Sequence, residues 1–351
     1  MSLYERVGNI HIHTLFSDGT ASPTDVAAIA ERVGLDYILI TDHIAYPREF
    51  QGWHGHTLVL IGEEVHAPAS PHLNHFLAFN AGEDVARYGD QPQRLIDAVR
   101  ARGGLGFIAH PYERSGAFVS EPEINWVAWD ADGYTGLEIW NYMSEFKAHV
   151  TTLPRALLYA FFPQLAITGP FPETLAKWDQ LQHTRRIVGI GGSDAHATIY
   201  HLGPLARRVF SYQHLFRSVN THLLVSSPWT GDASQDAQLV YQALAAGRAF
   251  VAYGGLAPAR GFSFTAECDG ATYTMGDEFS IHSEAIFRAR VPARAHLRLI
   301  HNGACVAEAT GTELIHRSSA PGFYRIEALR HYAFRERGWV YSNPIYVISA
   351  R

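Results

Sequence analysis

The segment Val7-Gly8-Asn9-Ile10-His11-Ile12-His13 decides the fold of this chain. Its apolar residues predict a short buried strand over Val7–Ile12. Because alternate residues of a strand point to the same side, the imidazoles of His11 and His13 are expected to project together from its carboxyl end. Two histidines at this spacing can begin a metal site, but on their own they are as typical of a solvated strand face. The rest of the sequence has to decide between these two interpretations.

Residues of the metal-ligand types recur where other predicted strands begin or end. The short motifs that contain them are Ser17-Asp18-Gly19, Thr41-Asp42-His43, Gly62-Glu63-Glu64, His75, Ala109-His110-Pro111 and Ser193-Asp194-Ala195-His196. In α/β barrels the carboxyl ends of parallel strands gather at one mouth, where active sites are built. Histidines scattered over a surface would show no such preference, so the sequence favours a metal centre.

Strand and helix patterns alternate over the first two-thirds of the chain. A helix is expected after Ser22-Pro23-Thr24-Asp25, with Ser22 as its N-cap and Gly34 closing it. The other predicted helices are 91–102, 172–182 and 235–246, and the predicted strands are 37–41, 57–61, 75–79, 105–109, 136–139, 187–190 and 249–253. This alternation predicts an α/β fold with a parallel sheet, either open or closed into a barrel.

The pattern changes after about residue 255, where short alternating strands replace the helices. The predicted strands are 262–266, 285–291, 297–301, 324–328 and 344–348, separated by turns such as Asp269-Gly270 and Asn302-Gly303. The simplest interpretation is a barrel domain over 1–255 followed by a small, sandwich-like all-β domain over 256–351.

Composition excludes several classes of function. The 351 residues have a formal net charge of −6 and a hydrophobic fraction of 47%, which is typical of a folded globular protein. No basic stripe is present to neutralise a nucleic-acid backbone, so duplex binding is not expected. No apolar run is long enough for a transmembrane helix, and no signal peptide is visible, so we expect a cytoplasmic protein. The two cysteines provide no disulfide framework, and a homo-oligomer remains open.

The order and spacing of these motifs resemble the PHP (polymerase and histidinol phosphatase) superfamily of metallohydrolases. The resemblance spans roughly residues 8 to 200 and implies a distorted (β/α)7 barrel that holds two or three divalent metal ions. The tail, with Ala243–Val251 and Trp339–Val347, is similar to the branch related to carbaryl hydrolase, which carries a C-terminal β domain.

The same resemblance implies three overlapping ligand sets. The first is His11, His13, Glu64 and Asp194; the second shares Glu64 and adds His75 and His110; the third is Asp18, His43 and His196. Glu64 is preferred to Glu63 because the family pattern is Gly-x-Glu followed by an apolar residue, here Val65. Asp42 is expected to orient a ligand rather than to bind a metal.

Mixed imidazole and carboxylate ligands suit zinc, manganese or iron. We expect a metal-bridging hydroxide to cleave a phosphate ester of a small molecule, with Glu64, Asp194 and His196 as catalytic residues. Hydrolysis of a carboxylic or carbamate ester, or of an amide, is the alternative, and a non-catalytic metal- or ligand-binding module is a third. Candidate substrate-binding residues are Arg114, Glu138, Asn141 and His201.

Overall fold

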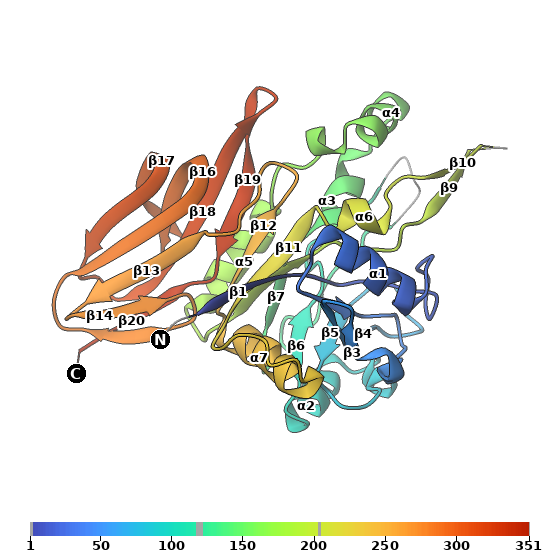
Figure 1. Cartoon of the computed structure of the whole chain (residues 1–351), viewed down its shortest axis with the longest axis horizontal. Helices are drawn as coiled ribbons and strands as arrows, with labels where there is room; N and C mark the ends of the chain where they lie inside the picture. Colours follow the sequence, from blue (N-terminus) through green and yellow to red (C-terminus); the bar gives the residue numbers. More distant parts are fainter. Residues whose placement is uncertain (1–2, 117–121, 203–204, 351) are drawn as a thin grey trace.

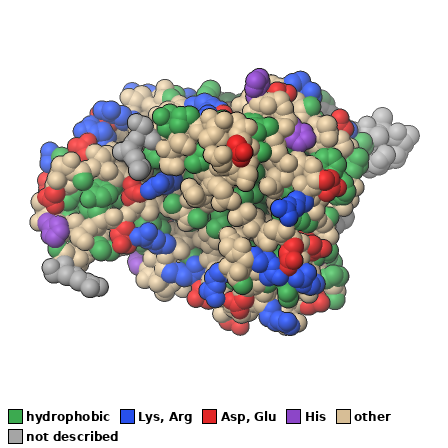
Figure 2. All heavy atoms as spheres, turned by 60° about the horizontal axis from the view of Figure 1, so that its bottom comes forward, with side chains coloured by type: hydrophobic (Ala, Val, Ile, Leu, Met, Phe, Trp, Pro, Cys, Tyr) green, Lys and Arg blue, Asp and Glu red, His purple; other side chains and the backbone are tan. Residues whose placement is uncertain are grey.

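The computed structural model describes residues 3–116, 122–202 and 205–350, with only the backbone described where it crosses residues 200–207. It is a mixed α/β protein built on a large sheet (Figure 1). The N-terminal part carries the helices, whereas the C-terminal strands lie together at the left of that view. Acidic and basic side chains are interspersed over the face in Figure 2.

The N-terminal part pairs its strands in the order β11–β1–β2–β4–β5–β6–β7–β8. Their bounds are β1 (Tyr4–Ile10), β2 (Tyr37–Ile40), β3 (Gly52–His54), β4 (Thr57–Val65), β5 (Phe76–Phe79), β6 (Leu105–Ile108), β7 (Gly136–Asn141), β8 (Val188–Gly192) and β11 (Val219–Val225). Strands β1, β2 and β4 are mutually parallel, as are β6, β7 and β8. A parallel bridge between Ile12 and Ala195 joins the segments that follow β1 and β8.

The expectation of a parallel sheet is wrong for β5, and β11, a strand that the sequence did not predict, is antiparallel as well. Strand β5 runs antiparallel to both β4 and β6, and β11 runs antiparallel to β1. Only residues 66–75 separate β4 from β5, and no helix lies between them. A parallel crossover needs about a dozen residues or more, so this connection favours antiparallel pairing. The distorted (β/α)7 barrel stays a prediction.

The helices follow local sequence signals closely. In α1 (Pro23–Val33), the Ser22 side chain accepts a hydrogen bond from the Asp25 amide, and Gly34 closes the helix at φ 87°. The other helices are α2 (Pro92–Ala101), α3 (Tyr142–His149), α4 (Leu153–Phe161), α5 (Pro172–Gln182), α6 (Tyr212–Leu215) and α7 (Ala233–Ala246), of which α3, α4 and α6 were not predicted. Among the described residues, no helix combines the length and apolar character needed to cross a membrane.

The C-terminal part is built from strands around a hydrophobic core of its own. After β12 (Ala249–Tyr253) come β13 (Ser263–Cys268), β14 (Ala271–Thr274), β15 (Glu278–Ile281), β16 (Ala285–His301), β17 (Ala304–Ser318), β18 (Gly322–Tyr332), β19 (Arg335–Ser342) and β20 (Ile345–Ser349). Because β12 pairs with β19, the sheet continues from one part into the other. The boundary at residue 255 stays a prediction.

The C-terminal prediction differs from the structure in several details, and it lacks β14, β15 and β19. The segments 285–291 and 297–301 belong to one strand, β16, whose register shifts between Arg290 and Ala295. Pro292 lies inside this shift, where the absence of its amide proton is tolerated. Strand β17 was missed because exposed and half-buried residues alternate along it, and the half-buried positions of its first half hold the small residues Cys305, Ala307, Ala309 and Gly311, which give no clear apolar pattern.

A buried ion pair connects the C-terminal strands to helix α5. Arg325 of β18 is 2% exposed and donates from Nε and Nη2 to the two carboxylate oxygens of Asp179, at 2.8 and 2.7 Å. Its Nη1 donates to Glu327 at 2.7 Å. Such a bidentate pair is specific in geometry and leaves an uncompensated buried charge when either partner is lost.

We therefore predict that Arg325→Ala lowers the free energy of unfolding by about 3–5 kcal/mol, measured by urea denaturation. The matched control is Arg317→Ala, which breaks an exposed pair with Glu284 and should cost less than about 1 kcal/mol. Equal losses in the two variants would contradict the importance of the buried pair.

Candidate metal centre

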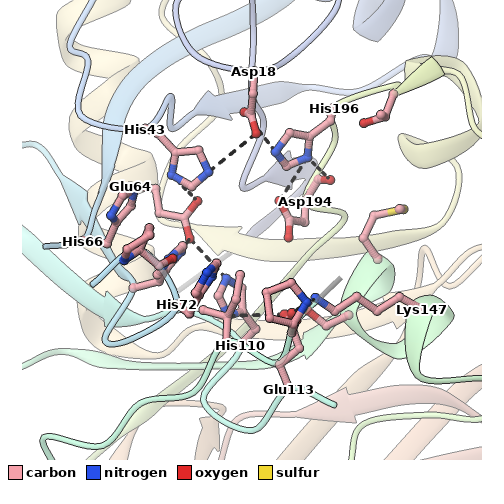
Figure 3. Close-up of a pocket in the computed structure, with 17 residues that line it drawn as sticks. Asp18, His43, Glu64, His66, His72, His110, Glu113, Lys147, Asp194 and His196 are labelled. Carbon is pink, nitrogen blue, oxygen red and sulfur yellow. Dashed lines mark hydrogen bonds and ion pairs between the residues drawn. The ribbon is translucent and has the colours of Figure 1, made fainter. Parts of the chain in front are cut away.

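The predicted ligand residues meet at one end of the N-terminal sheet, and Figure 3 shows those that line the adjoining cavity, among them Asp18, His43, Glu64, His110, Asp194 and His196. They come from the segments that follow β1, β2, β6 and β8, from the end of β4, and from the residue before β5: His11, His13, Asp18, His43, Glu64, His75, His110, Asp194 and His196. Because β5 is antiparallel to β4, its first residues lie beside the last residues of β4. The reversed direction of β5 thus explains why a histidine that opens a strand joins residues that end strands.

The carboxylate of Glu64 is the hub of this cluster. It is 1% exposed, and its two oxygens face different histidines. Oε2 lies 2.9 Å from His11 Nε2, 3.2 Å from His13 Nε2 and 3.4 Å from His43 Nδ1. Oε1 lies 2.7 Å from His75 Nδ1 and 3.2 Å from His110 Nε2. This division matches the first two ligand sets that the resemblance implies, with Glu64 shared between them.

Two aspartates complete the cluster. Asp194 Oδ1 lies 3.4 Å from His11 Nε2, 3.2 Å from His13 Nε2 and 3.4 Å from His196 Nδ1. Asp18 lies 3.1 Å from His196 Nε2 and 4.0 Å from His43 Nε2.

Three sets of ligand atoms lie within 4.8 Å of one another among the described residues: His11, His13, Glu64 and Asp194; His13, Asp18, His43 and His196; and His43, Glu64 and His75. His110 belongs to none of these sets, although its Nε2 faces the same Glu64 oxygen as His75.

The donor set fits divalent metal ions. His13 Nε2 and His43 Nδ1 are buried without a hydrogen bond in the described part of the chain, although each faces the carboxylate of Glu64. Buried polar atoms are normally paired, so atoms that converge without pairing mark a place for a cation. The residues of the first set are at most 15% exposed at their side chains, whereas the Asp18 side chain is 58% exposed. The first ligand set therefore lies at the buried bottom of the centre, and Asp18 lies at its solvent-exposed opening.

Electrostatics within the cluster agree with ligation. Burial alone would raise the pKa of Glu64 and Asp194, but the surrounding histidines hold both values well below the usual range. Burial lowers the pKa of His13, and Asp194 and Glu64 outweigh it, raising the value to about 9. Burial lowers the pKa of His43 to about 3, so this imidazole is neutral. Without a metal, protons on imidazoles such as His13 balance the buried carboxylates.

Carboxylates behind the ligands orient them. Glu138, predicted to bind substrate, is 1% exposed and lies behind His11, with Oε1 3.1 Å from His11 Nδ1. Asn141, also predicted to bind substrate, donates from Nδ2 to Glu138 at 3.0 Å and to Asp194 at 3.3 Å. Both residues therefore support ligands instead of lining the cavity where substrate would lie.

Asp42 accepts its hydrogen bonds from the loop that follows β1 and not from a histidine ligand. Its carboxylate accepts hydrogen bonds from the Thr14 amide and hydroxyl at 2.6 and 2.7 Å, and from Ser17 Oγ at 2.7 Å. Ser17 Oγ in turn lies 3.4 Å from His13 Nδ1. Asp42 therefore orients His13 indirectly, through Ser17. Glu63 points away from the centre as expected, and its Oε2 accepts the Val85 amide at 3.0 Å.

The remaining substrate-binding candidates lie elsewhere. Arg114 is exposed, pairs with Glu173 at 2.8 Å and stacks over Phe171, and it does not line the cavity beside the cluster. The cavity lining therefore gives no support to the substrate-binding prediction for Arg114. His201 lies in β9 (Ile199–Leu202), which pairs with β10 (Leu205–Arg208), and its side chain is outside the described residues.

The cavity beside the cluster contains residues that the sequence did not identify. It has a volume of about 470 Å³, and its lining includes Glu113, Met143, Ser144 and Lys147 in addition to six histidines. Three of these four residues lie on α3, which was not predicted. Lys147 is one of two lysines in the chain, but its position has no motif spacing that could have identified it.

The chain has distant similarity to several known proteins. No protein-family model matches the chain. An uncharacterized protein of Methanocaldococcus jannaschii is 26% identical over 120 residues, which is 30% of this chain and 67% of that protein. A two-domain protein of Bacteroides vulgatus, described as containing a predicted PHP-like metal-dependent phosphoesterase, aligns over 97% of this chain and 95% of its own, with 16% identity and a TM-score of 0.44. The chain is similar to PHP-like structures.

Two further solved structures align with part of the chain. One, from Bifidobacterium adolescentis, is described as a candidate metal-dependent phosphoesterase, with 18% identity, a TM-score of 0.36 and coverage of 54% of this chain and 87% of its own. The other is an amidohydrolase from Chromobacterium violaceum that contains bound sulfate. It has 14% identity and a TM-score of 0.27, and the alignment covers 57% of this chain and 94% of the amidohydrolase. At TM-scores below 0.5 these alignments carry none of the functional argument, which rests on the site. The resemblance of the tail to the carbaryl-hydrolase branch stays a prediction.

We predict that metal binding releases protons from the cluster. Ligating imidazoles must be neutral, and the pKa of His13, raised to about 9, keeps that residue protonated at neutral pH without a metal. The apparent affinity for Zn²⁺ or Mn²⁺ should therefore rise as the pH rises from 6 to about 8.5. Isothermal titration in buffers of different ionisation enthalpy measures the released protons. An affinity independent of pH would contradict this assignment.

Proposed function

We propose that this chain is a PHP-type metal-dependent hydrolase that cleaves a phosphate ester of a small molecule. The observation that carries the proposal is the division of histidines around Glu64, with His11 and His13 at one oxygen and His75 and His110 at the other. A carboxylate shared in this way is typical of centres that hold two metals about 3.5–4 Å apart.

The residues that would hold the metals are those of the three predicted sets. Such ions would polarise a phosphoryl oxygen and lower the pKa of a water molecule toward about 7. Zinc, manganese and iron all suit these ligands. His196 Nδ1 donates to the Asp194 carbonyl at 2.9 Å, which leaves its Nε2 unprotonated when the ring is neutral and facing Asp18 at the open end of the centre.

Asp194 is the residue best placed to handle a proton. Its side chain is 15% exposed and lines the cavity, and it belongs to the first ligand set, with His11, His13 and Glu64. Asn141 holds Oδ2 at 3.3 Å, which fixes the direction of the carboxylate. We infer that Asp194 accepts a proton from the attacking water and that His196 contacts a substrate oxygen at the cavity wall.

The size and lining of the cavity support a small phosphorylated substrate. Its volume of about 470 Å³ lies in the range of small-molecule sites. Six imidazoles line the cavity, and divalent ions held by the carboxylates would add positive charge there, which favours an anionic substrate. The three ligand sets give separate contacts for the several oxygens of a phosphoryl group.

The test is hydrolysis of p-nitrophenyl phosphate and p-nitrophenyl acetate by protein supplied with Mn²⁺ or Zn²⁺. We expect turnover of the phosphate and a loss of at least about 100-fold in kcat for Asp194→Asn. Arg114→Ala is the control and should keep the activity, since Arg114 lies outside the cavity. Turnover of the acetate alone would contradict phosphoesterase activity and favour the carboxylic ester alternative.

A further inference from the structure

Glu113 is a buried carboxylate that lines the cavity three residues after His110. It is 4% exposed, although none of the metal-ligand motifs includes it. Two residues of α3 hold it: Ser144 Oγ donates to Oε2, and Lys147 Nζ forms an ion pair with Oε1. The same Nζ donates to the Pro122 carbonyl at 3.1 Å. Figure 3 shows Lys147 reaching from α3 toward Glu113 and His110.

His110 lies between Glu113 and the Glu64 carboxylate. Its Nε2 is 3.2 Å from Glu64 Oε1, and its Nδ1 is 3.6 Å from Glu113 Oε2. The Nδ1 atom is buried and makes no hydrogen bond within the described residues. The carboxylate is thus on the correct side of the ring, at a distance slightly longer than a hydrogen bond.

His11 provides an internal comparison for this arrangement. Its Nε2 faces Glu64 at 2.9 Å, while its Nδ1 is held by Glu138 at 3.1 Å. Both histidines therefore have one nitrogen toward the shared carboxylate and the other toward a buried glutamate. Carboxylates in this second position fix the tautomer and the orientation of metal-binding histidines.

We propose that Glu113 is a positioning residue that orients His110 for the metal position that His110 shares with His75 at Glu64 Oε1. This inference rests on the proposed metal centre. His110 donates its Nδ1 proton to Glu113, which keeps the Nε2 lone pair directed toward Glu64. Contacts of this kind are often long before ligands bind and shorten afterwards.

Ser144 and Lys147 make helix α3 part of this support. Without Lys147, the charge of Glu113 would be buried beside the centre with only hydrogen bonds to stabilise it. Because α3 also forms a wall of the cavity, the same helix would line the substrate space and fix one metal position.

The test is the affinity of each metal in the full-length chain, measured by competition with a chelator and by elemental analysis. We expect Glu113→Gln to weaken one metal by about 10- to 100-fold and to leave the others at their wild-type affinity. The matched control is Glu63→Gln, which changes another buried glutamate beside the centre that faces away from it. This control variant should bind every metal with wild-type affinity.

Ser144→Ala keeps both charges and separates positioning from folding. It removes one hydrogen bond to Glu113 and should weaken the same metal by about 3- to 10-fold, while the metal-free chain stays folded with a Tm only a few degrees lower. Wild-type affinity for all metals in both Glu113→Gln and Ser144→Ala would overturn the inference while leaving the proposed function intact. A wild-type chain that binds no divalent metal would overturn both.

Discussion

The burial of the Glu64 carboxylate is the constraint on which the site depends. Five histidines approach its two oxygens within 3.4 Å: His11, His13, His43, His75 and His110. A buried, ionised carboxylate is expensive unless positive charge or hydrogen-bond donors surround it. Protons on some of these imidazoles meet that requirement in the absence of metals, and metal ions would meet it better. The same constraint brings together Glu64 of β4 and histidines that follow β1, β2 and β6 or precede β5.

The backbone adopts unfavourable conformations in two of the segments that bring ligands to the Glu64 carboxylate. His11 and Asp194 have φ of 68° and 54°, in the left-handed region that residues with a side chain rarely adopt. Such positions cost on the order of 1–3 kcal/mol each and cluster at functional sites. Hydrogen bonds across the two segments hold them: the His13 amide donates to the Ala195 carbonyl at 3.0 Å, and the Ala195 amide donates to His11 at 3.1 Å. Gly192 permits the close approach, since a Cβ there would lie 2.2 Å from the Ile10 carbonyl oxygen.

Local signals in the sequence were sufficient for the strands that end at the site and for helix α1, because caps and apolar runs act within a few residues. The predicted strand over Val7–Ile12 nevertheless ends at Ile10, since the left-handed conformation of His11 breaks the pleat. His11 and His13 thus converge through a turn of the backbone, not through strand alternation. The motifs placed the candidate ligands, and their assignment to metals stays a prediction.

The supporting roles of Glu138 and Glu113 could not be predicted, unlike that of Asp42, because they depend on contacts between residues far apart in the sequence. Glu138 meets His11 across 127 residues, and Ser144 meets Glu113 across 31. The direction of β5 and the placement of α3 against the cavity are likewise decided by packing. These contacts separate Arg114, which is at the surface, from Glu113 one residue earlier, which is buried.

The most direct test of the account is anomalous diffraction from crystals of the full chain grown with Mn²⁺ or Zn²⁺. We expect an anomalous peak among His11, His13, Glu64 and Asp194, and a second on the Oε1 side of Glu64, near His75 and His110. A well-ordered site with Glu64 bonded to the same histidines and no anomalous peak beside it would contradict the central claim that this carboxylate bridges metal ions.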